Sequence, residues 1–522
     1  MEQASACEVR KHMNQETILL LLREGERCRR IARSINDDVT SARLIELAEQ
    51  YEAEANAKAG LSSVEAQDPV SRPLVYCAAL SMALAGAFQV SGLCMETNDQ
   101  YFERKLEELK LLNSCLQTPL QLTPPRSVAE VIDRKFQLTA LIRSEHERQE
   151  WTTTETAWAN DRTRTAGPFK FKYDYQRADL NVLGPSFYDL GSEFVQETVY
   201  TSSGMAAISA LVLASLHAFG PADILVPHSA YGETVELIDG YARHLRKVII
   251  TGGLEAAASQ RTSPKLLLLD SSIAAGSFES ILRSRGDSLD LVIFDSTCFA
   301  GSSGHIRRVL RWASRWNVPT VMVRSHNKLD TLGSEYGRLG SASFVTPKCG
   351  ASQAGCDRLT KLISETKNAV RLFGGAALPE HFPPFLSAKS YRQATNRRVA
   401  AILRNSRRTS RHFSSSLKGL AAELHFVHGL YVTLRGHRPL DEAAARAAAA
   451  EMSEDLGRAG FPIRHAGSFG FDFASTEWFH DSTNDQYSVR LAIPDLPSAL
   501  WDSLTEAAAG WWAAHQSSIP IG

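Results

Sequence analysis

The feature that most constrains the fold is a repeated alternation of strand-like and helix-like segments between residues 198 and 324. Residues 266–269 and 291–294 are continuous apolar runs, as expected for strands buried on both faces. Such strands, alternating with helices, predict an α/β fold with a largely parallel sheet. The predicted strands are residues 198–200, 224–227, 247–251, 265–270, 289–295 and 320–324, and the predicted helices are residues 205–218, 232–244, 278–285 and 305–316.

Residues 1–150 are predicted to be helical, because apolar residues recur at helical spacing with charged residues between them. The predicted helices are residues 16–34, 39–58, 74–90, 99–116 and 127–149. Ser127 and Glu130 form a capping-box pattern at the start of the last one. Acidic and basic residues interleave along these helices, which predicts solvated faces and a packing or assembly role.

Beyond the alternating region the sequence predicts a second, smaller domain. A helix over residues 357–373 ends the α/β part, and a long basic helix over residues 392–420 follows it. The later predicted elements are residues 425–435, an Ala-rich helix at 440–460, and residues 461–473, 487–493 and 497–516. We therefore expect a helical N-terminal region (1–150), a large α/β domain (168–385) and a small α+β domain (386–522).

Composition narrows the classes of binding partner and the cellular compartment that we expect. The 522 residues carry a formal net charge of −1, which gives no electrostatic reason to expect nucleic acid or an acidic membrane surface. The eight cysteines include no CxxC pair, so we expect reduced thiols, no metal site and a cytoplasmic protein. The N-terminus shows no secretory signal, and the apolar run at residues 76–90 is shorter than a bilayer span.

A polar cluster follows the predicted strand at residues 320–324. It contains Ser325, His326, Asn327 and Lys328. Ligands of open α/β sheets bind at this carboxyl edge. The amine of Lys328 could form a Schiff base with a carbonyl cofactor once its pKa is lowered. The alternative is an ordinary lysine in a surface loop.

Two further sites lie where predicted strands end. Ser203, Gly204 and Met205 open a helix, and backbone amides at a helix start can bind a phosphate. An ordinary N-cap is the alternative. Tyr231 follows the next strand and could lay its ring over a planar cofactor, or simply pack against its neighbours.

Two charged residues complete the set. Asp295 ends the apolar run at residues 291–294, and a carboxylate in such a place needs a cationic partner. A protonated pyridine nitrogen would be one, and a helix N-cap is the alternative. Arg490 lies in a late strand and could bind a substrate carboxylate or an internal acid.

Together these residues resemble the fold type I enzymes that use pyridoxal 5′-phosphate (PLP). They are most similar to the Cys/Met metabolism branch, which includes the cystathionine γ-synthase and methionine γ-lyase relatives. The resemblance covers residues 168–520 and is carried, in order, by Tyr175-Gln176-Arg177, Ser203-Gly204-Met205, Tyr231-Gly232, Asp295, Ser325-x-Asn327-Lys328 and Arg490. It implies the aspartate aminotransferase-like large domain, followed by a small α+β domain.

The resemblance also implies roles for these residues. Lys328 would hold PLP covalently and shuttle protons, Asp295 would keep the pyridine nitrogen protonated, and Tyr231 would stack on the ring. Arg490 would bind the α-carboxylate of an amino acid. The phosphate would be held by Ser203, Gly204, Met205, Ser325, Asn327 and, from a neighbouring subunit, Tyr175 and Arg177. A site shared in this way implies at least a homodimer.

The sequence departs from the family at three places near the lysine. Asn327 stands where relatives usually have Thr, and residues 270–274 lack the Asn that contacts the cofactor's phenolic oxygen. Residues 329–336 replace a Gly/His-rich pattern, and the helical region 1–150 has no counterpart in compact relatives. These departures favour an enzyme of specialised metabolism with an unusual second, nucleophilic substrate.

The leading hypothesis is γ-elimination or γ-replacement on an amino acid through a vinylglycine-type electrophile. The donor would be S-adenosylmethionine or an O-acyl homoserine, and the reaction could form a carbon–carbon bond. A PLP-dependent aminotransferase, β-lyase or decarboxylase is the alternative. A catalytically silent relative that binds a partner protein is a weaker one, because such a chain has no reason to keep both Lys328 and Asp295.

Overall fold

The computed structural model divides the chain into two compact units, Met1–Gly92 and Leu93–Gly522. All residues that the structure describes belong to the second unit. They are residues 96–150, 164–172, 181–254, 263–348, 353–386, 389–417, 422–424, 429–436, 439–481 and 486–515. Within these ranges no helix has both the length and the apolar character needed to cross a membrane. The predicted helices at residues 16–34, 39–58 and 74–90 lie outside the described residues.

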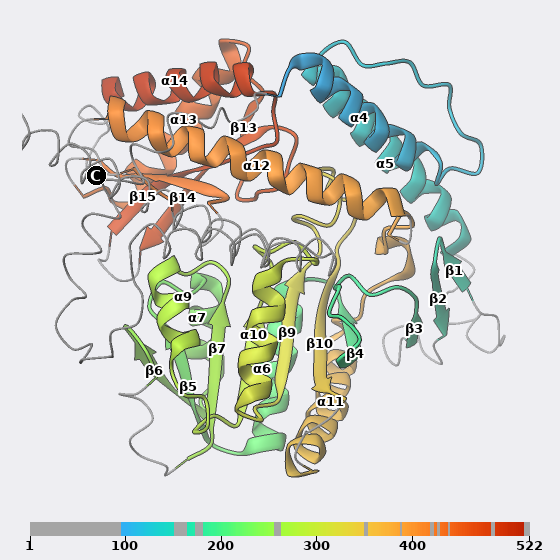
Figure 1. Ribbon diagram of the computed structural model, residues 1–522, viewed down its shortest axis with the longest axis vertical. Helices are drawn as coiled ribbons and strands as arrows, with labels where there is room; N and C mark the ends of the chain where they lie inside the picture. The colour runs from blue at the N-terminus through green and yellow to red at the C-terminus, as the bar shows by residue number, and fades with distance from the viewer. Residues whose placement is uncertain are drawn as a thin grey trace, which may run out of the picture. The chain divides into compact units, whose positions relative to one another are not determined.

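A seven-stranded sheet forms the centre of the α/β part (Figure 1). Its strand order is β4-β10-β9-β8-β7-β5-β6. Only β10 is antiparallel to its neighbours, so the other six strands run in one direction. The strands are β4 (Phe194–Thr201), β5 (Ala222–Pro227), β6 (Leu245–Ile250), β7 (Lys265–Asp270), β8 (Leu291–Asp295), β9 (Thr320–Ser325) and β10 (Gly340–Pro347).

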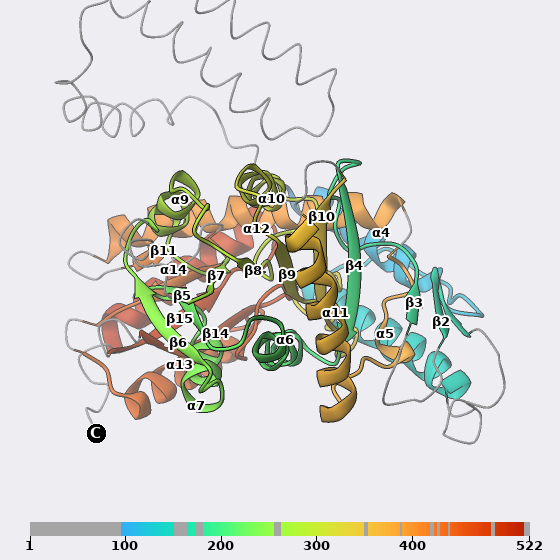
Figure 2. The same cartoon turned by 90° about the horizontal axis from the view of Figure 1, so that it is seen from below.

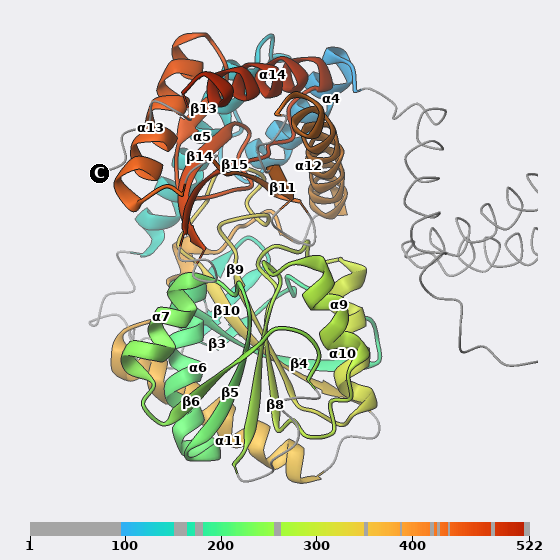
Figure 3. The ribbon, with the colours of Figure 1, turned by 90° about the vertical axis from the view of Figure 1, so that its left-hand side faces the viewer.

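Helices cover both faces of this sheet, which explains why β5 and β7 are buried along their whole length. The two views in Figures 2 and 3 place α6, α7 and α11 on one face and α9 and α10 on the other. The helices are α6 (Gly204–Phe219), α7 (Gly232–Tyr241), α9 (Ala275–Arg283), α10 (Gly304–Arg315) and α11 (Gln353–Phe373). The apolar side chains between sheet and helices form one continuous core.

The small C-terminal sheet has the strand order β11-β12-β15-β14-β13, and only the β13–β14 pair is parallel. Its strands are β11 (Ala422–Leu424), β12 (Tyr431–Leu434), β13 (Ile463–His465), β14 (Ala474–Asp481) and β15 (Gln486–Ala492). The accompanying helices are α12 (Lys389–Ser416), α13 (Glu442–Arg458) and α14 (Ser498–His515). Residues 461–473 were expected to form one element, but only β13 is regular there, and the long strand β14 follows it.

Two N-terminal helices, α4 (Asn98–Asn113) and α5 (Val128–Glu150), pack against each other and against the rest of this unit. The Ser127 hydroxyl accepts a hydrogen bond from the Glu130 amide at 3.2 Å, as the capping pattern predicts. Three short strands follow, β1 (Arg164–Ala166), β2 (Phe169–Lys172) and β3 (Asn181–Leu183), and a 3-10 helix, η2 (Pro379–His381), precedes α12.

The charged faces of α4 and α5 correct a prediction. Interleaved charges predicted solvated faces, but several of these side chains are buried and paired with acids and a base from the C-terminal part. We call this group the ionic cluster. Its members are Arg104, Lys105, Glu108, Lys135, Arg398, Asp472 and Asp495, and each is at most 8% exposed.

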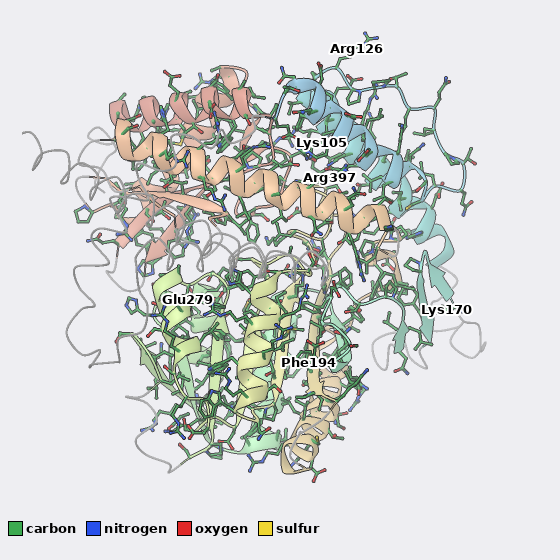
Figure 4. The ribbon with its side chains drawn as sticks, in the orientation of Figure 1. Lys105, Arg126, Lys170, Phe194, Glu279 and Arg397 are labelled. Atoms are coloured by element: carbon green, nitrogen blue, oxygen red, sulfur yellow. The ribbon has the colours of Figure 1, made fainter. Side chains whose placement is uncertain are left out.

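Ion pairs inside the ionic cluster connect three parts of the chain. The amine of Lys105 lies 2.5 Å from Asp472 and 2.6 Å from Asp495. Arg398, from α12, lies 2.5 Å from Asp472, and Lys135, from α5, lies 2.8 Å from the same carboxylate. Figure 4 shows Lys105 on α4 and Arg397 on α12; Arg397, next to Arg398 in the chain, is exposed and pairs with Glu107 instead.

The fold class predicted from the sequence is therefore confirmed: a mostly parallel sheet covered on both faces, a small α+β part and helices at the N-terminal side. The predicted strands and helices of the alternating region all occur, with ends shifted by a few residues. The strand β10 was not predicted, and the boundaries proposed for the three domains stay a prediction.

Candidate active site

The candidate site lies at the carboxyl edge of the large sheet, where β4, β7, β8 and β9 end. The strand register sets neighbouring polar residues side by side. Asp270 at the end of β7 is in register with Asp295 at the end of β8, and Gly340 of β10 is in register with both Thr201 and Ser325. The sheet thus brings together residues that are far apart in the sequence.

The start of α6 approaches the end of β9 closely enough to form a cradle. A Cβ atom on Gly204 would lie 3.0 Å from the Cβ of Ser325 and 3.1 Å from its amide nitrogen. A Cβ atom on Gly340 would lie only 2.1 Å from the carbonyl carbon of Ser203. Glycine is therefore required at position 340, and a larger residue at position 204 would have to displace Ser325 slightly. The resulting helix start, with backbone amides and two serines at hand, suits an anion such as a phosphate.

Ser203 is also the N-cap of α6, since its hydroxyl accepts a hydrogen bond from the Ala206 amide at 3.0 Å. The N-cap alternative for Ser203 is thus observed, and it leaves the hydroxyl free to donate to a ligand. Met205 lies in the first turn of α6, and its sulfur accepts a hydrogen bond from Thr234 at 3.8 Å.

Asp270 and Asp295 form a pair of neighbouring carboxyl groups, which we call the strand-edge pair. Removal from water raises the pKa of Asp295 to about 7, and the negative charge of Asp270 adds to the effect. Removal from water likewise raises the pKa of Asp270. The charges of Arg490 and Arg324 lower the pKa of Asp270 and of Asp295, respectively, but burial outweighs both effects. The pair therefore favours a bound cation, and a protonated pyridine nitrogen fits this requirement.

Backbone amides fix the two carboxyl groups in place. Asp270 accepts hydrogen bonds from the amides of Tyr231 and Ser272, each at 2.7 Å. Asp295 accepts one from the amide of Thr297 at 2.9 Å. The first of these bonds ties the start of α7 to the end of β7, so Tyr231 is held beside the strand-edge pair.

The Tyr231 side chain is available to a ligand, because it is 39% exposed at the start of α7. Partial burial raises the pKa of its hydroxyl well above the ordinary value, and the carboxylates of Glu233, Glu477 and Asp295 raise it further. The phenol therefore stays protonated at neutral pH. An exposed ring next to a planar ligand site can stack on the ligand.

Lys328 follows β9, and its amine meets a segment of the small C-terminal part. Its Nζ donates to the hydroxyl of Ser468 at 2.5 Å and lies 5.7 Å from the ring centre of Phe469. A Cβ atom on Gly470 would lie 2.6 Å from the Lys328 carbonyl oxygen, so the two segments are in direct contact. Lys328 is therefore a half-buried side chain with a polar partner, not a free surface lysine.

The residues that flank Lys328 are held by a buried charge network. Arg324 forms two hydrogen bonds with Asp330, at 2.6 and 2.7 Å, and His326 bonds the same carboxylate at 2.8 Å. Burial alone would raise the pKa of Asp330, but Arg324 and His326 bring it down to about 2. This network fixes both ends of the turn that carries Lys328.

The structure describes Asn327 but not the Tyr-x-Arg element. The side-chain oxygen of Asn327 accepts a hydrogen bond from the Leu339 amide at 3.3 Å, which closes the loop after the lysine. Its contact with a phosphate stays a prediction. Tyr175 and Arg177 lie outside the described residues, so their role across a subunit interface stays a prediction too.

Arg490 is buried on β15, in register with Glu477 on β14. Burial lowers the pKa of Arg490 to about 10, and Glu477 opposes that effect. Burial raises the pKa of Glu477, and the charges of Arg490 and Lys328 oppose it. Arg490 thus faces an internal acid, which was one of the two alternatives. It also lies close enough to Tyr231 and Asp270 to affect their charges, as a residue of the same site would.

Sequence reasoning missed Ser468, Glu477 and Glu335. The Glu335 carboxylate accepts a hydrogen bond from the Ser468 hydroxyl at 3.4 Å. The only signal for Ser468 was its position between two glycines, Gly467 and Gly470, in a segment that lacks regular structure. Glu335 lies among residues 329–336, the stretch already identified as a departure from the family.

We compared the chain with known families and proteins. No family model and no curated protein matches the sequence. Among solved structures, it is similar to a cystathionine γ-synthase from Xanthomonas oryzae pv. oryzae, in complex with aminoacrylate and cysteine, with 17% identity over 61% of this chain and 82% of that one and a TM-score of 0.43. It is also similar to metB from Corynebacterium glutamicum, with 17% identity over 60% and 80% of the two chains and a TM-score of 0.41.

Proposed function

We propose that this chain is a PLP-dependent enzyme that acts on an amino acid, with γ-elimination or γ-replacement as its reaction. The observation that carries the proposal is the strand-edge pair. Asp270 and Asp295 are neighbouring carboxyl groups whose pKa burial raises, against the opposing charges of Arg490 and Arg324. A protonated pyridine nitrogen would supply a further positive charge to this pair. PLP, when bound, draws electrons from the substrate carbon next to the amine.

The remaining groups fit the other ends of the same ligand. The start of α6 would bind a phosphate through its backbone amides, and Gly204 and Gly340 let it pack closely against the ends of β9 and β10. Lys328 would supply the amine that attacks a carbonyl carbon. The Tyr231 ring is exposed beside the strand-edge pair and suits a planar ring.

The chain's own residues can also carry out the proton transfers of the reaction. An amine such as that of Lys328 can accept a proton from Cα and return one to a neighbouring carbon. Ser468 holds that amine in one position. Tyr231 stays protonated and can donate a proton to a leaving group. Arg490 would bind the substrate carboxylate, sharing its charge between that group and Glu477.

The finer parts of the proposal depend on the family resemblance. They are a donor such as S-adenosylmethionine or an O-acyl homoserine, a second nucleophilic substrate and carbon–carbon bond formation in specialised metabolism. A cytoplasmic homodimer that shares Tyr175 and Arg177 between subunits belongs to the same group of proposals. An aminotransferase or β-lyase would use the same cofactor-binding residues, so the test must follow the substrate carbons.

Exchange of substrate hydrogens in deuterated water provides that test. The full-length chain with PLP is incubated with each donor, and deuterium at Cα and Cβ is followed by NMR. We expect exchange at both carbons with at least one donor, because γ-chemistry requires loss of both protons. Exchange at Cα alone would instead favour an aminotransferase or β-lyase, and absence of exchange with every donor would contradict the proposal.

Two lysine variants provide the controls. Lys328→Ala should abolish exchange at both carbons. Lys247→Ala removes a lysine that pairs with Asp239 at the surface, far along the chain from the site, and should leave exchange unchanged. Equal loss in both variants would show that the assay reports on protein quality, not on the amine of Lys328.

A further inference from the structure

Residues 329–336, which we call the post-lysine loop, contain an unusual run of backbone conformations. Leu332 has a φ of 53°, Gly333 of 89° and Glu335 of 45°. Side-chain-bearing residues rarely adopt positive φ, and they keep it only where their surroundings fix the backbone. The loop carries Glu335 towards Lys328, so what fixes this backbone also positions that carboxylate.

Helix α5 fixes the loop at two points. The buried amine of Lys135 donates to the carbonyl oxygen of Leu332 at 2.7 Å. Further along α5, His146 shares a hydrogen bond with the hydroxyl of Tyr336 at 3.0 Å. These contacts lie on either side of Glu335 along the loop. The helix therefore holds the positive-φ segment on both sides of Glu335.

The ionic cluster connects the same helices to the segment that contains Ser468. A Cβ atom on Gly333 would lie 2.4 Å from a guanidinium nitrogen of Arg398, so the loop touches the cluster directly. Arg398 also donates to the carbonyl oxygen of Gly470 at 2.6 Å. The post-lysine loop and the Ser468 segment are thus both attached to one set of buried charges.

The two segments meet at the amine of Lys328. A serine hydroxyl has one proton to donate. Ser468 donates that proton to Glu335, over 3.4 Å, and so it presents a lone pair to the amine of Lys328, 2.5 Å away. The carboxylate of Glu335 therefore determines which way the hydroxyl faces.

We propose that α4 and α5 are a fixed part of the site and hold Glu335 as a positioning residue, which orients the Ser468 hydroxyl towards the amine of Lys328. From the proposed function, this inference takes only the reactive role of Lys328. It gives the described part of the N-terminal region a task in the site rather than in assembly alone.

Charge around the amine gives the inference a measurable consequence. The carboxylates that face the amine of Lys328 are Glu335 on the loop and Glu477 on β14, and Arg490 and His465 act in turn on Glu477. A nearby carboxylate, linked through a hydroxyl, favours the protonated amine. Loss of the charge or of the orientation at Glu335 should therefore make the Lys328 amine react faster with an electrophile.

The reactivity of that amine can be measured without any cofactor. The full-length chain, free of PLP, is labelled with trace acetic anhydride at a fixed neutral pH, and the acetylated Lys328 peptide is quantified by mass spectrometry against the other lysine peptides. We expect Glu335→Gln to raise the acetylation rate at Lys328 about three- to tenfold, because a nearby negative charge holds the proton on an amine. An unchanged rate in Glu335→Gln would overturn the proposal.

Three other variants test the part of α5. Lys135→Met and Tyr336→Phe should raise the same acetylation rate, and neither should raise it further in combination with Glu335→Gln. Tyr336→Phe keeps the ring and removes only the hydroxyl, so it remains informative if Lys135→Met does not fold. Arg134→Ala is the control, since Arg134 bonds only Thr123 and Glu130 near the surface.

Two results would count against the role of α5. A wild-type acetylation rate in Tyr336→Phe would show that the helix does not position Glu335, and an equal increase in Arg134→Ala would show that any damage to α5 has the same effect. Because the labelling needs no PLP, a chain that fails to bind PLP would refute the proposed function and leave this inference standing.

Discussion

The ionic cluster and the strand-edge pair are both sets of buried acids, yet they differ in what surrounds them. In the cluster, burial alone would raise the pKa of Asp472, but Arg398, Lys105 and Lys135 bring it well below its ordinary value. In the strand-edge pair, burial raises the pKa of both carboxyl groups, and the charges of Arg490 and Arg324 oppose this effect without outweighing it. The same removal from water thus has opposite outcomes.

The difference indicates in which region the chain itself supplies the charges that balance the buried acids. The cluster contains its own cations, so its acids are satisfied within the chain and contribute to structure. The strand-edge pair lies at the edge where ligands bind, and the charges of Arg490 and Arg324 do not bring its pKa values back to the ordinary range. A ligand with a positive charge would complete it. Substitutions of the same chemical kind should therefore have opposite effects in the two regions.

The largest effect is expected for Asp472→Asn in the ionic cluster. The substitution leaves Lys105, Lys135 and Arg398 without their shared carboxylate, and breaking such a buried network costs about 3 to 5 kcal/mol. Denaturant unfolding of the full-length chain measures the loss. A loss below about 1 kcal/mol would mean that the cluster is open to solvent, contrary to its burial.

The same Asp-to-Asn change at Asp295 should stabilise the chain when no ligand is bound. With a pKa of about 7, the ionised carboxylate costs stability above that pH, and the neutral amide does not. We expect a gain of roughly 2 to 4 kcal/mol at pH 8 in the same unfolding assay. Destabilisation by Asp295→Asn would remove the contrast between the two regions.

The advantage of Asp295→Asn should depend on pH. Because the pKa of Asp295 is higher in the folded chain than in the unfolded one, the folded chain binds the extra proton between about pH 4 and pH 7. The wild-type stability linked to this group is present below that window and is lost as pH rises through 7. The difference between variant and wild type should therefore vanish near pH 4. Taking the difference cancels the contribution of buried histidines.

The smallest effect is expected for Arg397→Ala, next to the cluster in the sequence. Arg397 pairs with Glu107 at the surface, and both side chains are largely exposed. Exposed pairs of this kind contribute below about 1 kcal/mol, less at high salt. Unfolding at low and high salt tests this. A large loss would place Arg397 in the cluster together with Arg398.

The large sheet could be predicted because its strands are apolar along their whole length. Leu266–Leu269 in β7 and the residues of β8 that precede Asp295 are hydrophobic without interruption, which only a strand buried on both faces explains. The strand β10 could not be predicted, because its first residues are small: Gly340, Ser341 and Ala342. Gly340 must be small because the start of α6 lies against it, and that approach is a tertiary feature.

Site residues could be predicted where a reactive side chain lies at the end of a strand. They could not be predicted where a loop supplies the residue. Asp295, Ser325 and Lys328 follow apolar strands, so their position alone indicated the sheet edge. Ser468 and Glu335 lie in loops that only the tertiary fold brings to Lys328. The prediction of a solvated face on α4 was wrong for a similar reason. The sequence shows that a helix has a charged face, but it does not show what covers that face.

Reduction of the bound cofactor with borohydride tests the central claim most directly. The full-length chain is mixed with PLP, reduced and digested, and the modified lysine is identified by mass spectrometry in the wild type and in Asp295→Asn. We predict one PLP per chain, attached at Lys328, and at least tenfold weaker PLP binding in Asp295→Asn, the loss of about 1.4 kcal/mol or more from one charge pair. Attachment at another lysine, or equal binding by both proteins, would contradict the account.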